Sequence, residues 1–396
     1  MTRRQVMKLG LCGAASAMLS FDPASAQDDF DFSFKKEGGV NPELYVKEAR
    51  FYQKLDDGKV ECRLCPRVCR IIDKERGFCG VRENRSGSYV TMVYGRACAL
   101  HNDPIEKKPL YHFLPGARSL SVATPGCNIE CKFCQNWQIS QFRPEQVECF
   151  PAFPEDLVQA AARYNIPSIA YTYTEPVVFY EYMFDCAVRG RAFGIHSVMI
   201  SNGYIQKEPM EALIPHLSAV KIDLKAFTDT FYRDFCRGGL KPVLDTLELL
   251  RRMDKWFEIV VLILPGQNDG DQEIRDMCSW VVDRLGPDVP MHFTRFYPSY
   301  KIQNLPGTPV ATLERIHDIA GQCGIHYAYV GNVPGHKWNH TFCHHCQEMV
   351  VRRSGLYGVE VRLKSDGTCP HCGTRIPGIW NPPDDRQVSA SRRSLP

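Results

Sequence analysis

The sequence has no long apolar run, since no stretch approaches the ~18 uninterrupted apolar residues of a membrane-spanning helix. It also lacks a dense run of basic residues, and its net charge is only +3 over 396 residues. The charge therefore argues neither for nor against nucleic-acid binding. No glycine-rich phosphate loop opens an expected helix, and no repeat of fixed period is present. Apolar residues make up 44% and charged residues 23%, which is typical of a globular protein with one large core and one or two small modules.

Cysteine is the residue in excess, with 18 in the chain. Eleven of them fall into three clusters with the spacing of metal ligands, so the excess indicates metal binding. Six others stand mostly in apolar surroundings, where a free cysteine usually behaves as a small hydrophobe: Cys98, Cys149, Cys186, Cys236, Cys278 and Cys323.

The central cluster is a C-x3-C-x2-C triplet, Cys127, Cys131 and Cys134. Clustered thiolates suit a soft metal, and iron–sulfur clusters are held by cysteine sulfur. Because a [4Fe-4S] cluster has four irons, three cysteines leave one iron open unless another ligand comes from elsewhere. An open iron can chelate a small molecule through its amine and carboxylate groups. Three buried structural cysteines or a zinc knuckle are the alternatives.

From Ser119 onward, short β-rich runs alternate with longer helical ones. Near-continuous apolar strands separated by amphipathic helices indicate βα units around a parallel sheet. Six or seven such units predict an α/β fold with a partial TIM-like (β/α) barrel, and a flat doubly wound sheet is the alternative. The expected strands are Ser119–Thr124, Ser168–Tyr173, His196–Ser201, Ala219–Leu224, Glu258–Leu264, Met291–Thr294 and His326–Val330. The expected helices lie near residues 155–164, 176–192, 207–214, 240–253, 271–285 and 311–322.

Polar residues follow the expected strands at their carboxyl ends, the edge where barrel active sites form. One polar loop residue would mean little, but a set at successive strand ends favours a ligand site. Two of them, Asp223 and Lys225, are two positions apart on a strand, so both point to the same face, into the barrel lumen. A mutual ion pair is the alternative to a ligand contact there. The set consists of Thr174, Glu175, Ser201, Asn202, Asp223, Lys225, His292 and Arg295.

The triplet and its aromatic neighbour Phe133 resemble the radical S-adenosylmethionine (SAM) superfamily. The segments Asp103–Phe113, Cys131–Trp137 and Gly331–His336 are similar to AmmeMemoRadiSam-system radical SAM enzymes, relatives of the pyruvate formate-lyase-activating enzyme. The resemblance implies that Cys127, Cys131 and Cys134 hold a [4Fe-4S] cluster whose open iron chelates SAM. An electron from the cluster then cleaves SAM to a 5′-deoxyadenosyl radical, which abstracts hydrogen from a substrate.

The resemblance also implies individual SAM contacts. Phe133 approaches the adenine, Thr174 and Glu175 bind the amino group, and ribose and carboxylate contacts fall on Ser201, Asn202, Asp223 and Lys225. Asp223 and Lys225 match the activating enzymes' D-L-K motif. Two positions depart from their pattern: Ile200 stands where they carry an aspartate, and the second strand ends in Thr-Glu-Pro rather than in a glycine-rich motif.

A second cysteine cluster, Cys62, Cys65, Cys69 and Cys79, precedes the expected barrel. Four thiolates at short spacing can bind zinc or an auxiliary [4Fe-4S] cluster, and two disulfides formed after export are the alternative.

The third cluster consists of two C-x2-C pairs, Cys343 with Cys346 and Cys369 with Cys372. The double spacing predicts a structural zinc ribbon whose pairs converge through a hairpin over residues 350–364. The neighbouring histidines are expected to be exposed bystanders, and free or disulfide-bonded pairs are the alternative. Zinc ribbons also bind nucleic acid, and Arg352 and Arg353 leave nucleic acid open as a partner.

The N-terminus resembles a twin-arginine export signal over Thr2–Lys8, followed by an apolar stretch and Ala24-Ser-Ala26 for cleavage. We expect export to the periplasm, with a cytoplasmic protein as the alternative. Six parts are expected: a signal (1–26), a linker (27–50), an N-terminal cysteine-rich module (51–112), the barrel (113–330), a zinc-ribbon-like module (331–380) and a disordered tail (381–396).

The leading hypothesis is a radical SAM enzyme with a [4Fe-4S] cluster, SAM and zinc, fed by a low-potential electron donor. Its substrate is unknown, and kinship with activating enzymes suggests a polypeptide. A radical SAM enzyme acting on RNA and a non-catalytic iron–sulfur electron carrier are the rivals. SAM contacts at several strand ends favour the enzyme, because a carrier needs none of them.

Overall fold

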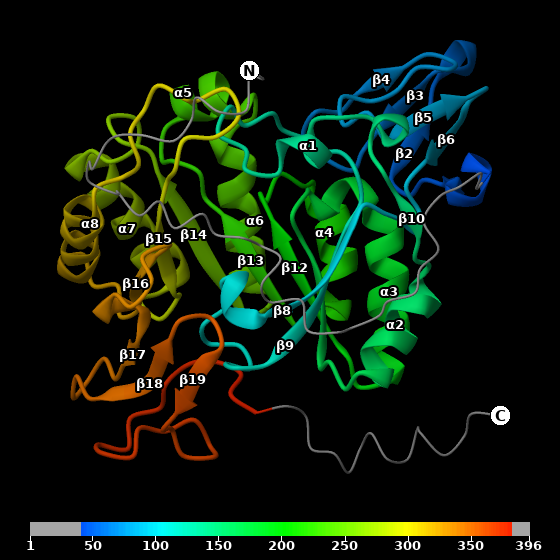
Figure 1. Cartoon of the computed structure of the whole chain (residues 1–396). Helices are drawn as coiled ribbons and strands as arrows, with labels where there is room; N and C mark the ends of the chain where they lie inside the picture. The colour runs from blue at the N-terminus through cyan, green and yellow to red at the C-terminus, as the bar shows by residue number, and fades with distance from the viewer. Residues whose placement is uncertain (1–40, 382–396) are drawn as a thin grey trace, which may run out of the picture. The chain divides into compact units, whose positions relative to one another are not determined.

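A computed structural model describes residues 41–381, and its centre is one eight-stranded sheet (Figure 1). The strands stand in the order β16-β15-β14-β13-β12-β11-β9-β8. Those from β9 to β16 pair in parallel, and β8 pairs with β9 in antiparallel orientation. Their bounds are β8 Ala99–Pro104, β9 Arg118–Ala123, β11 Ser168–Tyr171, β12 His196–Ser201, β13 Ala219–Asp223, β14 Phe257–Ile263, β15 Met291–Arg295 and β16 Ala328–Gly331.

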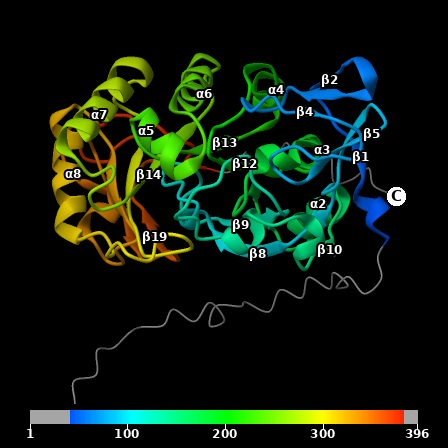
Figure 2. The same ribbon diagram turned by 90° about the horizontal axis from the view of Figure 1, so that it is seen from above.

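Helices connect the parallel strands and lie along the outer side of the curved sheet (Figure 2). Neighbouring parallel strands follow chain order, whereas a doubly wound sheet reverses its order at a switch point. The predicted partial (β/α) barrel is therefore confirmed. The longer helices are α2 Pro154–Arg163, α3 Tyr180–Ala192, α4 Lys207–Leu213, α6 Leu240–Arg252, α7 Asp271–Leu285 and α8 Val310–Gln322, and a 3-10 turn, Pro176–Phe179, precedes α3.

The parallel strands are buried on both faces, which is why they read as nearly continuous apolar runs. On β13, Val220 and Ile222 are fully buried, and the alternate residues Lys221 and Asp223 line a cavity on the other side. The alternation along β13 thus separates apolar residues under the helices from charged residues in the lumen, whereas β12 and β14 give the lumen an apolar part, formed by Ile200, Val260 and Leu262.

The N-terminal module consists of small antiparallel sheets that pack on the barrel. Part of the segment predicted to be a linker is structured: a 3-10 turn, Pro42–Tyr45, precedes β1, and Tyr45 is buried. β8 lies within the expected module of residues 51–112 and joins the large sheet, so this sheet begins before residue 113. The strands are β1 Lys47–Glu48, β5 Arg82–Arg85 and β6 Ser88–Thr91 in one sheet, β2 Tyr52–Lys54, β3 Val60–Cys62 and β4 Arg70–Ile71 in another, and β7 Arg96–Ala97 paired with β10 Phe150–Pro151.

The C-terminal module is a three-stranded antiparallel sheet below the barrel (Figure 1). Its strands are β17 Thr341–Phe342, β18 Met349–Ser354 and β19 Gly358–Val361, so a hairpin forms within the predicted range. Cys343, Val350 and Cys369 pack against Tyr111 and Tyr329 of the barrel.

The predicted export signal, residues 27–40 of the predicted linker and the tail from residue 382 lie outside the described residues. Within residues 41–381, no helix has both the length and the apolar character needed to cross a bilayer.

Candidate active site

The carboxyl ends of the parallel strands open onto a cavity of about 510 Å³. Its wall combines the cysteine triplet with polar residues that follow several strands, as the strand-end pattern predicts. The cavity is lined by Cys127, Cys131, Phe133, Cys134, Thr174, Glu175, Asn202, Asp223 and Lys225 among the predicted residues. Lys107, Lys108, Tyr173, Lys221, Thr294 and Asn332 also line it.

The loop that carries the triplet is held on two sides by backbone hydrogen bonds. Glu130 N donates to Cys236 O and Lys132 N donates to Phe235 O, both at 2.8 Å, and Lys301 N donates to Lys132 O at 2.9 Å. The loop is therefore fixed at its sides while its three cysteines face the cavity.

Burial raises the pKa of the Cys127 thiol, and a hydrogen bond with Cys236 together with burial raises that of Cys131. These groups become thiolates when a metal binds, because a coordinated thiol is deprotonated. The sequence predicts an ordinary core residue at Cys236, because nothing in its sequence context marks it as a neighbour of the triplet.

Glu175 is one of two carboxylates in the cavity wall and is almost completely buried. Its carboxylate accepts hydrogen bonds from Ser201 Oγ (2.7 Å), Asn202 N (2.8 Å) and Val177 N (3.1 Å). Burial raises the pKa of Glu175 to about 7, although these donors favour the ionised form. Ser201 therefore positions Glu175, and it does not line the cavity itself.

Asp223 lies between two lysines. Lys225 Nζ donates to Asp223 Oδ2 at 2.9 Å, and Lys221 Nζ donates to Oδ1. Burial opposes ionisation of Asp223, but the two ammonium groups outweigh it and lower the pKa to about 2. The mutual ion pair between Asp223 and Lys225 is thus present, and Lys221, Asp223 and Lys225 all face the cavity. Lys221 was missed, although it shares the period-two alternation of Asp223 and Lys225.

A second cluster of charges lies beside the cavity, where Asp103 of β8 pairs with two lysines, Lys107 and Lys108, that line the cavity. Asp103 Oδ2 accepts from Lys108 Nζ at 2.7 Å and from the hydroxyl of Tyr173, and Lys107 Nζ donates to Oδ1 at 2.9 Å. Burial lowers the pKa of Lys108 to about 8. The sequence marks this segment only through its resemblance to known enzymes, because no periodicity predicts that β8 joins the sheet.

His292 is a predicted site residue that the structure does not bring to the cavity. It is 1% exposed and its Nε2 lies 2.7 Å from Glu258 Oε2, below the residues that line the cavity. The next lumen-facing residue on β15, Thr294, occupies the cavity wall instead. Arg295 donates to Thr308 O at 2.7 Å and does not line the cavity either.

Comparisons with known proteins agree with this geometry. The family model described as "Radical SAM superfamily" matches residues 121–278, which include the triplet, Glu175, Asp223 and Lys225. An uncharacterized protein of Methanocaldococcus jannaschii is 44% identical over 335 residues, which are 84% of this chain and 99% of the relative. The chain belongs to the radical SAM superfamily.

More distant similarities are found as well. A second uncharacterized protein of Methanocaldococcus jannaschii is 25% identical over 300 residues, 70% of this chain and 77% of the relative. A solved radical SAM methyltransferase from Sphaerobacter thermophilus is 14% identical with a TM-score of 0.45, over 72% of this chain and 76% of that chain. A domain of pyruvate-formate lyase-activating enzyme from Bacteroides vulgatus ATCC 8482 is 17% identical with a TM-score of 0.37, over 41% of this chain and 98% of that chain.

The radical SAM superfamily implies a [4Fe-4S] cluster and SAM, and the residues present fit both. Three cysteines enter one cavity from a single fixed loop, which suits a cluster with one open iron. Glu175, Asp223 and Lys225 provide charges of both signs in the same cavity, which suits a zwitterionic ligand.

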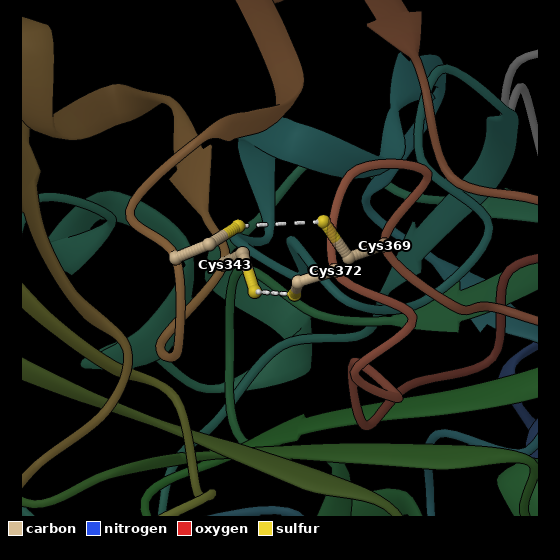
Figure 3. A group of neighbouring side chains, drawn as sticks. Cys343, Cys369 and Cys372 are labelled. Atoms are coloured by element: carbon tan, nitrogen blue, oxygen red, sulfur yellow. Dashed lines mark hydrogen bonds between the residues drawn. The ribbon is translucent and has the colours of Figure 1, made fainter.

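The C-terminal cysteines form a separate group, and their side chains point toward one another (Figure 3). Cys343 Sγ lies 3.6 Å from Cys372 Sγ, Cys346 Sγ lies 3.7 Å from Cys369 Sγ, and all four sulfurs lie within 4.8 Å of one another. Tetrahedral zinc with Zn–S bonds of about 2.3 Å places its ligands about 3.8 Å apart. The four sulfurs therefore fit one zinc ion.

Two side chains beside this group differ from expectation. His344 is not an exposed bystander, because its Nδ1 lies 2.7 Å from the hydroxyl of Tyr327. Arg353 is 2% exposed and donates to Tyr111 O at 2.6 Å, so it is not available to contact nucleic acid.

Proposed function

We propose that this protein is a radical SAM enzyme of the AmmeMemoRadiSam type that abstracts hydrogen from a polypeptide. The observation that carries the proposal is that the cysteine triplet shares one cavity with Glu175, Asp223 and Lys225. An electron carrier has no use for such charges beside its cluster, whereas an enzyme that binds SAM needs them.

Cys127, Cys131 and Cys134 are the residues that would hold the cluster. When bound, the cluster supplies the electron that breaks a carbon–sulfur bond of SAM and yields the 5′-deoxyadenosyl radical. The chain's own residues bind SAM, orient it and exclude water from the cavity.

Glu175 is assigned to the amino group of SAM, from whose N–H groups its carboxylate can accept hydrogen bonds. Burial raises the pKa of Glu175 to about 7, and the positive sulfonium charge of SAM beside it would favour the ionised form. Ser201 and the backbone N–H of Asn202 orient its two oxygens. Thr174, whose hydroxyl donates to Thr124 O at 2.7 Å, fixes the loop beside Glu175.

Lys225 is assigned to the carboxylate of SAM, and Asp223 to the ribose hydroxyls. Asp223 holds Lys225 in its charged form by raising its pKa against the effect of burial. Phe133, which is 3% exposed and lines the cavity, is assigned to the adenine ring.

A polypeptide substrate is supported by the resemblance of the segments Asp103–Phe113 and Gly331–His336 to relatives of glycyl-radical activating enzymes. In the structure both segments reach the cavity, through Lys107 and Lys108 on one side and Asn332 on the other. Their polar side chains border the space that a substrate segment would enter.

The test is anaerobic reconstitution of the protein with iron and sulfide, followed by incubation with SAM and dithionite. We expect 5′-deoxyadenosine to form. A fully reduced protein that yields none would show an electron carrier and overturn the enzyme assignment. Incubation with candidate peptides that carry deuterium on carbon then identifies the substrate, because abstraction from a carbon–deuterium bond transfers deuterium to the 5′-deoxyadenosine.

A further inference from the structure

The four N-terminal cysteines meet at one small cavity, although they come from different turns of the chain. Cys62 ends β3, Cys65 and Cys69 follow in the next loop, and Cys79 precedes β5. All four line the same cavity. The convergence of cysteines that are up to 17 positions apart indicates a single binding site.

The sulfur spacing in this N-terminal tetrad (Cys62, Cys65, Cys69 and Cys79) differs from that of the C-terminal group. The C-terminal sulfurs lie within 4.8 Å of one another, and among the described residues no three sulfurs of the N-terminal tetrad form such a group. A single zinc ion needs the close spacing. A [4Fe-4S] cluster places its cysteine ligands around a cube of iron and sulfide, which requires a wider one.

The surroundings of the tetrad suit an anionic, dry centre. The cavity wall includes Val177, Val178 and Tyr89, and Arg82 supplies a cation that is only 1% exposed. Arg82 is held in place by Glu181, with Nη1 donating to Oε1 at 3.2 Å. A cluster with four thiolate ligands is negatively charged, so a fixed buried guanidinium beside it is electrostatically favourable.

The tetrad lies directly behind the loop of the catalytic triplet. A Cβ atom on Gly126 would lie 2.9 Å from Cys79 O and 2.6 Å from Val81 Cγ1, so only glycine permits this approach. Asn128 lines the tetrad cavity, and its Oδ1 accepts from Asn202 Nδ2 at 2.9 Å on the side of the active site. The residues on both sides of Cys127 thus contact the tetrad region.

We propose that Cys62, Cys65, Cys69 and Cys79 bind a second [4Fe-4S] cluster that passes electrons to the catalytic cluster. In each transfer the second cluster is oxidised by one electron and the catalytic cluster is reduced by one electron, with no atom or proton moved. A low-potential one-electron donor reduces the second cluster again. The electron-transfer role rests on the proposed function, whereas the metal site does not.

The decisive variant removes the catalytic triplet and leaves the tetrad intact: Cys127→Ala, Cys131→Ala and Cys134→Ala together. Iron, acid-labile sulfide and zinc are measured per chain after anaerobic reconstitution. We expect about eight iron and eight sulfide ions in the unmodified protein and about four of each in the variant, with about one zinc in both. A variant with no iron, whether or not it holds a second zinc, would overturn the proposal, as would about two irons.

A complementary variant replaces all four tetrad cysteines by serine, with Cys323→Ser as the matched control. It should lose about four irons and keep one zinc, while Cys323→Ser should lose nothing. This readout needs no activity, and it distinguishes failure of the second cluster from failure of SAM cleavage.

The electron-transfer role has its own signature in electron paramagnetic resonance. The dithionite-reduced protein with both clusters should give lines broadened by spin coupling, and each cluster-deficient variant should give the sharper signal of one cluster. A spectrum equal to the sum of the two variants' spectra would overturn the transfer role.

Discussion

The barrel lumen contains two layers of buried charge, and they differ in what their charges face. The upper layer (Glu175, Asp223 and Lys225) lies at the carboxyl ends of the strands and borders a cavity of about 510 Å³. In the lower layer (Glu258 and His292), Glu258 accepts from His292 Nε2 at 2.7 Å, from His112 N at 2.8 Å and from Tyr111 N at 2.9 Å. The lower charges are enclosed by protein, and the upper ones border free volume.

The difference shows how a buried charge can be assigned. A buried carboxylate is costly unless its lone pairs are satisfied, and protein donors satisfy Glu258 completely. Glu175 also has three donors, but its pKa of about 7 shows that burial still disfavours its charge. The upper layer therefore places a carboxylate disfavoured by burial beside free volume, which suits a ligand site, whereas the lower layer is enclosed by its own donors.

The largest effect is expected from removing the cysteines that would hold the catalytic cluster beside the upper layer. Replacing Cys127, Cys131 and Cys134 together should abolish 5′-deoxyadenosine formation, because no ligand set for the catalytic cluster remains. Product is measured chromatographically after incubation with SAM and dithionite. The matched control is Cys186→Ser, a buried cysteine outside the cavity. Unchanged cleavage in the triple variant would end the assignment of the site.

The next largest effect is expected from removing the zinc site of the C-terminal module, which packs beside the lower layer. Cys343→Ser with Cys346→Ser should lose about one zinc per chain and loosen the C-terminal module, because binding energy at such sites is folding energy. SAM cleavage without substrate should largely survive, since the upper layer keeps its residues. Zinc is measured by elemental analysis and loosening by limited proteolysis.

For this pair of substitutions, Cys98→Ser is the control, since it lies outside both tetrads. Zinc content that stays at the level of the unmodified protein would show that the four cysteines do not form a zinc site.

The sequence predicts the residues of the upper layer, but it does not predict that His292 belongs to the lower one, and the reason is physical. Strands of period two reveal that Asp223 and Lys225 share a face, and parallel order brings successive strand ends to one edge. The sequence does not reveal how far each residue lies from the carboxyl end of the sheet. His292 and Thr294 therefore look equivalent until the register of β15 is known. The antiparallel β8 was also missed, because its short polar sequence, Ala99–Pro104, carries no strand pattern.

A smaller effect distinguishes the two layers by comparing SAM affinity with thermal stability. Lys225→Met should weaken SAM binding to the cluster-loaded protein by on the order of 1.5–3 kcal/mol, about 10- to 150-fold, because a charge-assisted contact is lost. Thermal stability should change little, since Lys221 still pairs with Asp223. Affinity is measured by titration with SAM, alongside a melting curve, and Lys207→Met, at an exposed position, is the control.

Glu258→Gln makes the corresponding change in the lower layer, where the opposite result is expected. It should lower the melting temperature and leave SAM affinity unchanged in the folded protein, because an amide cannot accept from all three donors. Stability lost in Lys225→Met with unchanged SAM affinity would make the upper ion pair structural and remove Lys225 and Asp223 from the site.

The smallest effect concerns His112, which joins the lower layer to the C-terminal module. Its Nδ1 lies 2.6 Å from Pro377 O and therefore carries the proton, so Nε2 accepts from the hydroxyl of Tyr329 at 2.6 Å. Burial lowers the pKa of His112 from 6.5 to about 4. Between these values the unfolded chain binds more protons than the folded one, so stability falls as the pH falls.

This linkage gives a pH-dependent prediction for the junction. Between pH 7 and pH 5, His112 should remove on the order of 2 kcal/mol from the free energy of unfolding. In His112→Gln this part of the pH dependence should disappear, although the variant is less stable at pH 7 because one hydrogen bond is replaced. Denaturant unfolding at several pH values measures it, with the exposed His326→Gln as control. If the two variants lose stability equally between pH 7 and pH 5, His112 is not held neutral, and the lower layer is less enclosed than its hydrogen bonds indicate.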